Sequence, residues 1–105
     1  MTDKMLVLST AGSGTEARKI ANQLVERRLA ACVNIIPQIQ SVYRWEGKVE
    51  TAEEFLLIVK TTKTCSADVQ AAIRELHSYD LPESIVIAME DGSAEYLKWI
   101  EESVG

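Results

Sequence analysis

Residues 31–62 limit most strongly how this chain can fold. Apolar and polar side chains alternate through residues 33–45 and again through 49–59, and a period of two is typical of β-strands. Glu46-Gly47 separates the two runs, and glycine supplies the positive φ that a tight reversal needs. Residues 55–59 are apolar on both faces, as in a strand in the middle of a sheet. The stretch therefore predicts one long β-hairpin.

The length of this hairpin predicts self-association. A strand from Lys48 to Thr61 would span roughly 45 Å at ~3.3 Å per residue. A compact chain of this size has a diameter of only about 33 Å, so an unbent hairpin would extend beyond its own domain. An exposed, half-apolar strand pair needs a cover, and the simplest cover is another copy in closed symmetry. The alternative is a bulge at Pro37, which cannot donate to the ladder and could bend the hairpin back within the monomer.

The other predicted elements alternate between strand and helix. Residues 5–8 form a short apolar strand, and Ser13-x-x-Glu16 has the spacing of a capping box at a helix start. Apolar residues then recur at helical spacing until about Arg28. Later elements are a second helix from about residues 64–66 to 77, a loop over 77–83, a strand over 85–89, and a C-terminal helix that buries Tyr96, Trp99 and Ile100.

This order, βαββαβ plus a terminal helix, is the ferredoxin-like α+β pattern. An antiparallel sheet carries both main helices on one face, and right-handed crossovers fix the rest. The first and third strands are the most continuously apolar, so we expect them in the centre. With 105 residues, the whole chain, 1–105, is expected to form a single domain.

Charge and composition exclude several kinds of partner. The formal charge of −5 and pI of about 4.8 argue against nucleic acid or an anionic membrane as the main partner. No apolar run approaches the ~20 residues of a membrane span, and no signal-peptide pattern opens the chain. The two cysteines, Cys32 and Cys65, make no disulfide framework. A cytoplasmic location is expected.

A few side chains could support chemistry. Cys32 lies in a mostly apolar run, as a small buried hydrophobe or as a soft thiolate ligand for copper. His77 is the one histidine, so it is a helix cap or part of a site completed by other residues or other subunits. Lys60 ends an apolar strand and should pair with a carboxylate, from Glu54 or Glu83, because burying an unpaired ammonium is costly.

Four linked motifs occur in order along nearly the whole chain. They are Ala30-Ala-Cys32-Val-Asn-Ile-Ile-Pro37, Tyr43-Arg-Trp45-Glu-Gly-Lys48, Lys60-Thr-Thr62, and His77-Ser-Tyr79 with Pro82-Glu83. Together they resemble the CutA family of divalent-cation tolerance proteins. The resemblance implies a ferredoxin-like fold and a tight homotrimer related to the PII signalling proteins. It also implies a cytoplasmic location and an association with copper and other divalent metals.

The resemblance also directs attention to two sets of residues. The metal set is Cys32, His77 and Glu83. A small-ligand pocket between subunits would contain Tyr43, Trp45, Lys60 and Tyr79. The chain departs from some family members at Ser9, where they carry a copper-associated Cys, and at Ser78, where they carry Pro.

Three function classes follow. The favoured class is a homotrimeric protein that binds copper or other divalent metals in metal tolerance. The alternative is a PII-like signalling or scaffold module that binds a small ligand, or an unidentified protein partner, at the cleft between subunits. An enzyme is not expected, because nothing in the sequence supplies a nucleophile with a base and an orienting acid. No organic cofactor is expected.

Overall fold

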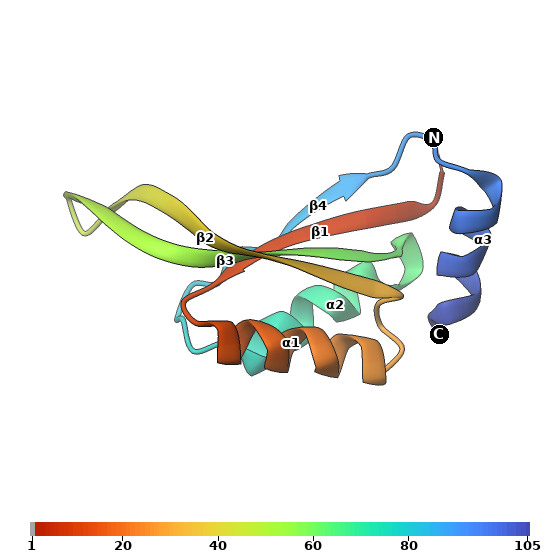
Figure 1. The fold of residues 1–105 in the computed structure, drawn as a ribbon, viewed down its shortest axis with the longest axis horizontal. Coiled ribbons are helices and arrows are strands. Elements are labelled where there is room, and N and C mark those ends of the chain that lie inside the picture. Colours follow the sequence, from red (N-terminus) through yellow and green to blue (C-terminus); the bar gives the residue numbers. More distant parts are fainter. Residues whose placement is uncertain (1) are drawn as a thin grey trace.

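The computed structural model describes residues 2–105 as one four-stranded antiparallel sheet with α1 and α2 on one face (Figure 1). The strand order is β2-β3-β1-β4, so the first and third strands lie in the centre as predicted. The ferredoxin-like prediction is confirmed. The elements are β1 (Lys4–Ala11), α1 (Gly14–Glu26), β2 (Cys32–Trp45), β3 (Lys48–Thr62), α2 (Lys63–Leu76), β4 (Ile85–Ala88) and α3 (Ala94–Ser103).

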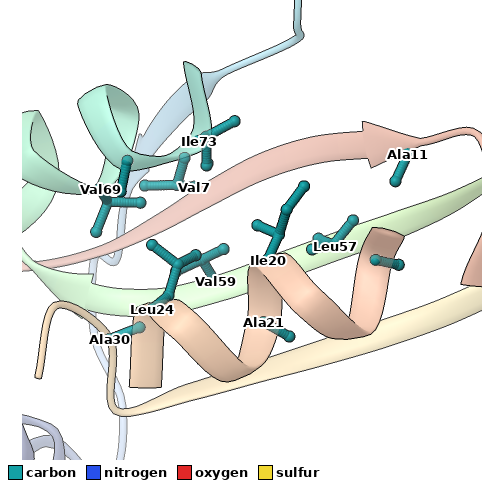
Figure 2. Close-up of a cluster of buried hydrophobic side chains, with 12 residues drawn as sticks. Val7, Ala11, Ile20, Ala21, Leu24, Ala30, Leu57, Val59, Val69 and Ile73 are labelled. Carbon is teal, nitrogen blue, oxygen red and sulfur yellow. The ribbon is translucent and has the colours of Figure 1, made fainter. Parts of the chain in front are cut away.

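The hydrophobic core lies between the sheet and the two helices (Figure 2). Val7 of β1 is opposite Val59 of β3, and directly paired residues lie on the same face of a sheet. Both belong to the core, so this is the face that the helices cover. Ile20 of α1 and Ile73 of α2 pack onto them, and all four are fully buried. Each such side chain contributes about 1.5–3 kcal/mol when it leaves water.

Side-chain caps fix where α1 and α2 begin. The Ser13 hydroxyl accepts from the Glu16 amide at 3.2 Å, and the Thr62 hydroxyl accepts from the Cys65 amide at 3.3 Å. Both bonds satisfy helical N–H groups that have no partner within the helix. The capping box is therefore half present, because the Glu16 carboxylate contacts the loop after α2 instead.

The β2–β3 hairpin extends past the rest of the sheet. Its turn is Glu46-Gly47, both at positive φ (50° and 80°). The register of β3 with β1 ends at Phe55, so residues 48–54 pair only with β2 over about 23 Å. The molecule measures 44 × 25 × 22 Å, and the hairpin forms its long end (Figure 1). The predicted overhang is confirmed. A bulge does lie between Ile36 and Ile39, but the hairpin stays extended.

The second face of the sheet is apolar and mostly uncovered. Leu8 of β1 is opposite Ile58 of β3 on one side and Ile85 of β4 on the other. Ile85 is 50% exposed, and Leu8 and Ile58 are only half-buried. A contiguous apolar surface of this kind usually marks an interface. We call it the open face; its apolar residues are Leu6, Leu8, Ile36, Leu56, Ile58, Ile85 and Ile87.

Helix α3 covers only one end of the open face. It begins at the Ser93 cap and lies beside the end of the sheet in Figure 1. Ile100 is fully buried, but Tyr96 and Trp99 stay exposed, so the prediction that all three are buried is wrong for two of them. Because α3 contacts only the end of this face, only a narrow stripe of the helix surface is buried. No helix in the described part of the chain is long and apolar enough to cross a bilayer.

Candidate functional site

The loop after α2 is held to the ends of β1 and α1 by His77. The side chain of His77 is 0% exposed, and its Nε2 lies 2.6 Å from the Thr10 carbonyl oxygen. Because a carbonyl only accepts, Nε2 donates. Nδ1 accepts from the Tyr79 amide at 3.1 Å and lies 3.0 Å from Oε1 of Glu16. Both ring nitrogens are therefore engaged within the chain. We call His77, Thr10, Glu16 and Ser78 the His77 cluster.

Glu16 completes this cluster as an acceptor. Its carboxylate accepts from the Ser78 amide at 2.9 Å and from the Ser78 hydroxyl at 2.7 Å. Burial raises the pKa of Glu16, but the hydrogen bonds from Ser78 outweigh it, with help from the nearby His77 and Lys19. The net effect is a lowered pKa. The ionised carboxylate thus ties the loop to the first turn of α1.

This lowered pKa predicts an acid-sensitive contribution to stability. A carboxyl with a lowered folded pKa stabilises the fold above its ordinary value of 4.5, and that contribution is lost as pH falls through the folded pKa. We expect wild type to be more stable than Glu16→Gln at about pH 7, with the difference shrinking toward about pH 3. Urea unfolding across this range measures it, with the exposed Glu26→Gln as control. A constant difference across the whole range would contradict the assignment.

Beside the His77 cluster, Tyr79 turns toward the overhanging hairpin. Its hydroxyl donates to Oε2 of Glu54 at 2.8 Å. Burial and this carboxylate together raise the pKa of Tyr79 to about 12, so the hydroxyl keeps its proton. A Cβ at Gly12 would lie 2.9 Å from the Tyr79 hydroxyl oxygen, so the missing side chain at Gly12 leaves room for this contact.

A groove of about 600 Å³ separates the loop from the hairpin. Three aromatic side chains line it, Tyr43, Trp45 and Tyr79, together with the carboxyl-bearing Glu54 and Asp80. We call it the aromatic groove. Its complete lining is Thr10, Ser41, Val42, Tyr43, Trp45, Glu54, Tyr79, Asp80, Leu81 and Glu83.

The groove unites three of the four residues predicted for a ligand pocket, and Lys60 is not among them. Lys60 lies six residues along β3 from Glu54, about 20 Å away. Its ammonium contacts the Tyr96 hydroxyl at 3.2 Å and lies 5.4 Å from the centre of that ring. The expected pairing of Lys60 with Glu54 or Glu83 is wrong, because Lys60 is only half-buried and needs no buried counter-charge.

The predicted metal set does not come together within one chain. Cys32 is opposite Lys60, which is in turn opposite Leu6. Thr10, against which His77 packs, lies four residues further along β1, or about 13 Å. Glu83 lines the aromatic groove instead. Within residues 2–105, no group of three or more His, Cys, Asp or Glu side chains is arranged to hold a metal. Ligation by all three residues stays a prediction that needs more than one subunit.

Two acidic residues have roles that the sequence did not reveal. Glu16 was expected to complete a capping box, and Glu54 to neutralise Lys60. Each instead contacts the loop over residues 77–83, through His77 and Ser78 or through Tyr79. The one available signal was Glu54 itself, an acidic residue directly before the apolar run 55–59.

Known proteins resemble this chain over nearly its full length. The family model described as CutA1 divalent ion tolerance protein matches residues 5–103. The divalent-cation tolerance protein CutA of Thermus thermophilus is 45% identical over 100 residues, covering 95% of this chain and 97% of that protein. The Archaeoglobus fulgidus protein of the same name is 48% identical over 95 residues, covering 90% and 92%. The human protein CutA is 42% identical, and the match spans 48% of its length.

Solved structures agree with these sequence matches. The Thermus thermophilus Cut A1 structure superposes with a TM-score of 0.95 at 44% identity, covering 97% of this chain and 99% of that one. CutA from Xylella fastidiosa gives 0.97 at 38% identity, covering 99% and 100%. Fold and sequence therefore lead to the same conclusion: this chain belongs to the CutA1 family of divalent ion tolerance proteins.

Proposed function

We propose that this divalent-cation tolerance protein works as a homotrimer that binds divalent metal ions, copper among them. The open face carries the assembly proposal, because it leaves a continuous apolar surface on a chain of only 105 residues. Both sheet edges, β2 and β4, also lack a partner strand among residues 2–105. Pairing one edge of a subunit with the other edge of its neighbour is heterologous, and such contacts close in a ring of three when each subunit is rotated by a third of a turn.

Cys32 is the proposed soft ligand for copper. It is partly accessible on β2, whereas Cys65 is buried in α2. Thiolate ligands favour copper over hard cations such as Mg²⁺. His77 and Glu83 are the proposed further donors, supplied by other subunits. His77 can take this role only if a ring nitrogen gives up its present partner, either Nδ1 the Tyr79 amide or Nε2 the Thr10 carbonyl.

Copper titration tests this proposal. In calorimetry of the reduced protein, Cys32→Ser should lower copper affinity at least tenfold, or about 1.4 kcal/mol. Cys65→Ser is the matched control, since it removes a thiol that is buried elsewhere, and it should leave affinity unchanged. Equal affinity in wild type and Cys32→Ser would contradict the proposal. Unchanged affinity in His77→Gln would remove His77 from the donor set and leave Cys32.

A second candidate is a PII-like module that responds to a small ligand. One observation favours it: the aromatic groove has the volume and the mixture of aromatic and polar groups that small-molecule sites show. The docking of a protein partner would then depend on that ligand. A pull-down with and without copper tests the scaffold role. A metal-responsive scaffold should change its bound partners when copper is added.

We further propose that the protein acts in the cytoplasm and without catalysis. Its two cysteines are unpaired, which fits a reducing compartment. Relatives differ in location, since the Archaeoglobus structure is named as periplasmic and the Arabidopsis protein as chloroplastic. Turnover of acyl phosphates by the purified protein would contradict the non-enzymatic part of this proposal.

A further inference from the structure

Helix α3 is held to the rest of the chain mainly by polar contacts. Ile100 is the one residue of α3 that is fully buried. The Arg28 guanidinium, just after α1, donates to the carbonyl oxygens of Glu102 at 3.1 Å and Gly105 at 2.8 Å. The last carbonyls of a helix have no partner within it, and a cation beside them is favourable. Helix α3 is therefore anchored although it buries little apolar surface.

Two aromatic side chains of α3 pack against each other but stay uncovered in the single chain. Tyr96 and Trp99 are three residues apart and so are neighbours on one side of the helix. Their ring centres are 5.4 Å apart, and the rings are tilted by 35°. Tyr96 is 41% exposed and Trp99 is 43% exposed. We call them the α3 aromatic pair. Tyr and Trp are enriched at interfaces between proteins, so the pair marks a contact surface.

The α3 aromatic pair is fixed in place and adjoins the open face. The Lys60 ammonium donates to the Tyr96 hydroxyl at 3.2 Å, and Trp99 packs against the Tyr96 ring. Lys60 is opposite Leu6, an open-face residue, in the register of β3 with β1. A preorganised surface loses less conformational entropy on binding than a flexible one. The pair therefore continues the open face as a rigid aromatic contact.

The charge near the pair argues against an anionic partner. Residues 90–103 carry five acidic side chains and one basic side chain, Lys98. This surface would repel nucleic acid and anionic membranes. A second copy of the chain that covers the open face, as proposed above, reaches the pair at the margin of that face. Continuity and charge thus favour a second copy as the partner.

We propose that the α3 aromatic pair is covered by a second copy of this chain, with Trp99 as the main contact of α3 in the assembly. This inference rests on the homotrimer of the proposed function and names residues outside the open face that stabilise it. It does not depend on copper or on a ligand in the aromatic groove. Desolvated Trp and Tyr side chains contribute much of the binding free energy at protein interfaces.

Subunit exchange measures how much Trp99 contributes. Unlabelled protein is mixed with ¹⁵N-labelled protein in dilute urea, and native mass spectrometry follows the appearance of mixed trimers. Trp99→Ala should exchange at least about tenfold faster than wild type, because losing an interface tryptophan mainly raises the dissociation rate. Lys98→Ala is the matched control, since Lys98 is exposed beside Trp99 on α3, and it should exchange like wild type.

Two variants of Tyr96 distinguish a contact between subunits from one within the chain. Tyr96→Phe loses the bond to Lys60 but keeps the ring, whereas Tyr96→Ala loses both. We expect Tyr96→Ala to speed exchange about tenfold and Tyr96→Phe to change it less than about threefold, because the ring makes the contact. Circular dichroism checks that each variant is folded.

Fluorescence quenching tests the same contact without altering it. The chain has two tryptophans, so Trp45→Phe leaves Trp99 as the one reporter. In the trimer, acrylamide should quench Trp99 about fivefold less than it quenches free N-acetyltryptophanamide, because the partner covers the ring. A Trp99 side chain that stays 43% exposed would remain readily quenched.

The possible results separate this inference from the assembly itself. Faster exchange in Trp99→Ala, together with shielded Trp99, supports the proposal. A wild-type trimer in which Trp99 is readily quenched, or in which Trp99→Ala exchanges like wild type, overturns it and leaves the homotrimer standing. Equally fast exchange of Tyr96→Phe and Tyr96→Ala also overturns it, because the effect would then come from the bond to Lys60. A single-chain mass for wild type overturns both this inference and the proposed assembly.

Discussion

Ile58→Lys is expected to convert the assembly into single chains. Ile58 lies in the middle of the open face, opposite Leu8 on one side and Asn34 on the other. In a trimer that buries this face, the substitution would place an unpaired ammonium among apolar side chains. Such burial costs several kcal/mol, so the dissociation constant should rise at least about a thousandfold. In the single chain the residue is only half-buried, and the lysine can extend into water.

Light scattering coupled to size-exclusion chromatography measures this effect. Ile58→Leu is the matched control, since it conserves volume and apolarity and should keep the wild-type mass. Circular dichroism should show that Ile58→Lys keeps its helices and strands. A wild-type mass for Ile58→Lys at micromolar concentration would contradict the claim that the open face is buried between subunits.

His77→Ala is expected to lower the free energy of unfolding by about 3 kcal/mol. The substitution leaves the Thr10 carbonyl, the Tyr79 amide and the Glu16 carboxylate without their contacts to the ring. It also creates a cavity where a fully buried side chain was. The loop over residues 77–83 should loosen, and the Tyr79 wall of the aromatic groove with it.

Urea unfolding at neutral pH measures the loss. His77→Gln is the informative control, because its amide keeps one donor and one acceptor and should recover part of the stability. A loss below about 1 kcal/mol in His77→Ala would show that the cluster contributes little to the fold. The same two variants also serve as controls for the copper experiment. They distinguish the loss of His77 as a metal ligand from a loosening of the loop over residues 77–83.

The hairpin and the strand order could be predicted from the sequence because both depend on periodicity. Alternation through residues 33–45 and 49–59 predicted two strands and their turn. The overhang was predicted because the expected strand is longer than the diameter of a compact chain of this size. The apolar run over 55–59 identified a central strand, which the order β2-β3-β1-β4 confirms. These features depend on local pattern and on the size of the domain, so they can be predicted without knowing where each side chain lies.

The candidate site was harder to predict, because its parts come from loops and strand ends. The partner of Glu54 depends on how the loop over 77–83 folds, and no periodic pattern specifies that path. Lys60 shares β3 with Glu54 but lies near α3, so its place in a family motif did not put it in the groove. Tyr96 and Trp99 fit the pattern of buried helical residues, but α3 covers too little of the sheet to bury them.

The mass of the wild-type protein in dilute solution tests the proposed assembly most directly. Light scattering at micromolar concentration should give three times the chain mass of 11.7 kDa, because the open face and the overhanging hairpin are then covered. A mass of 11.7 kDa, with the chain still folded by circular dichroism, would contradict the assembly and with it every site shared between subunits.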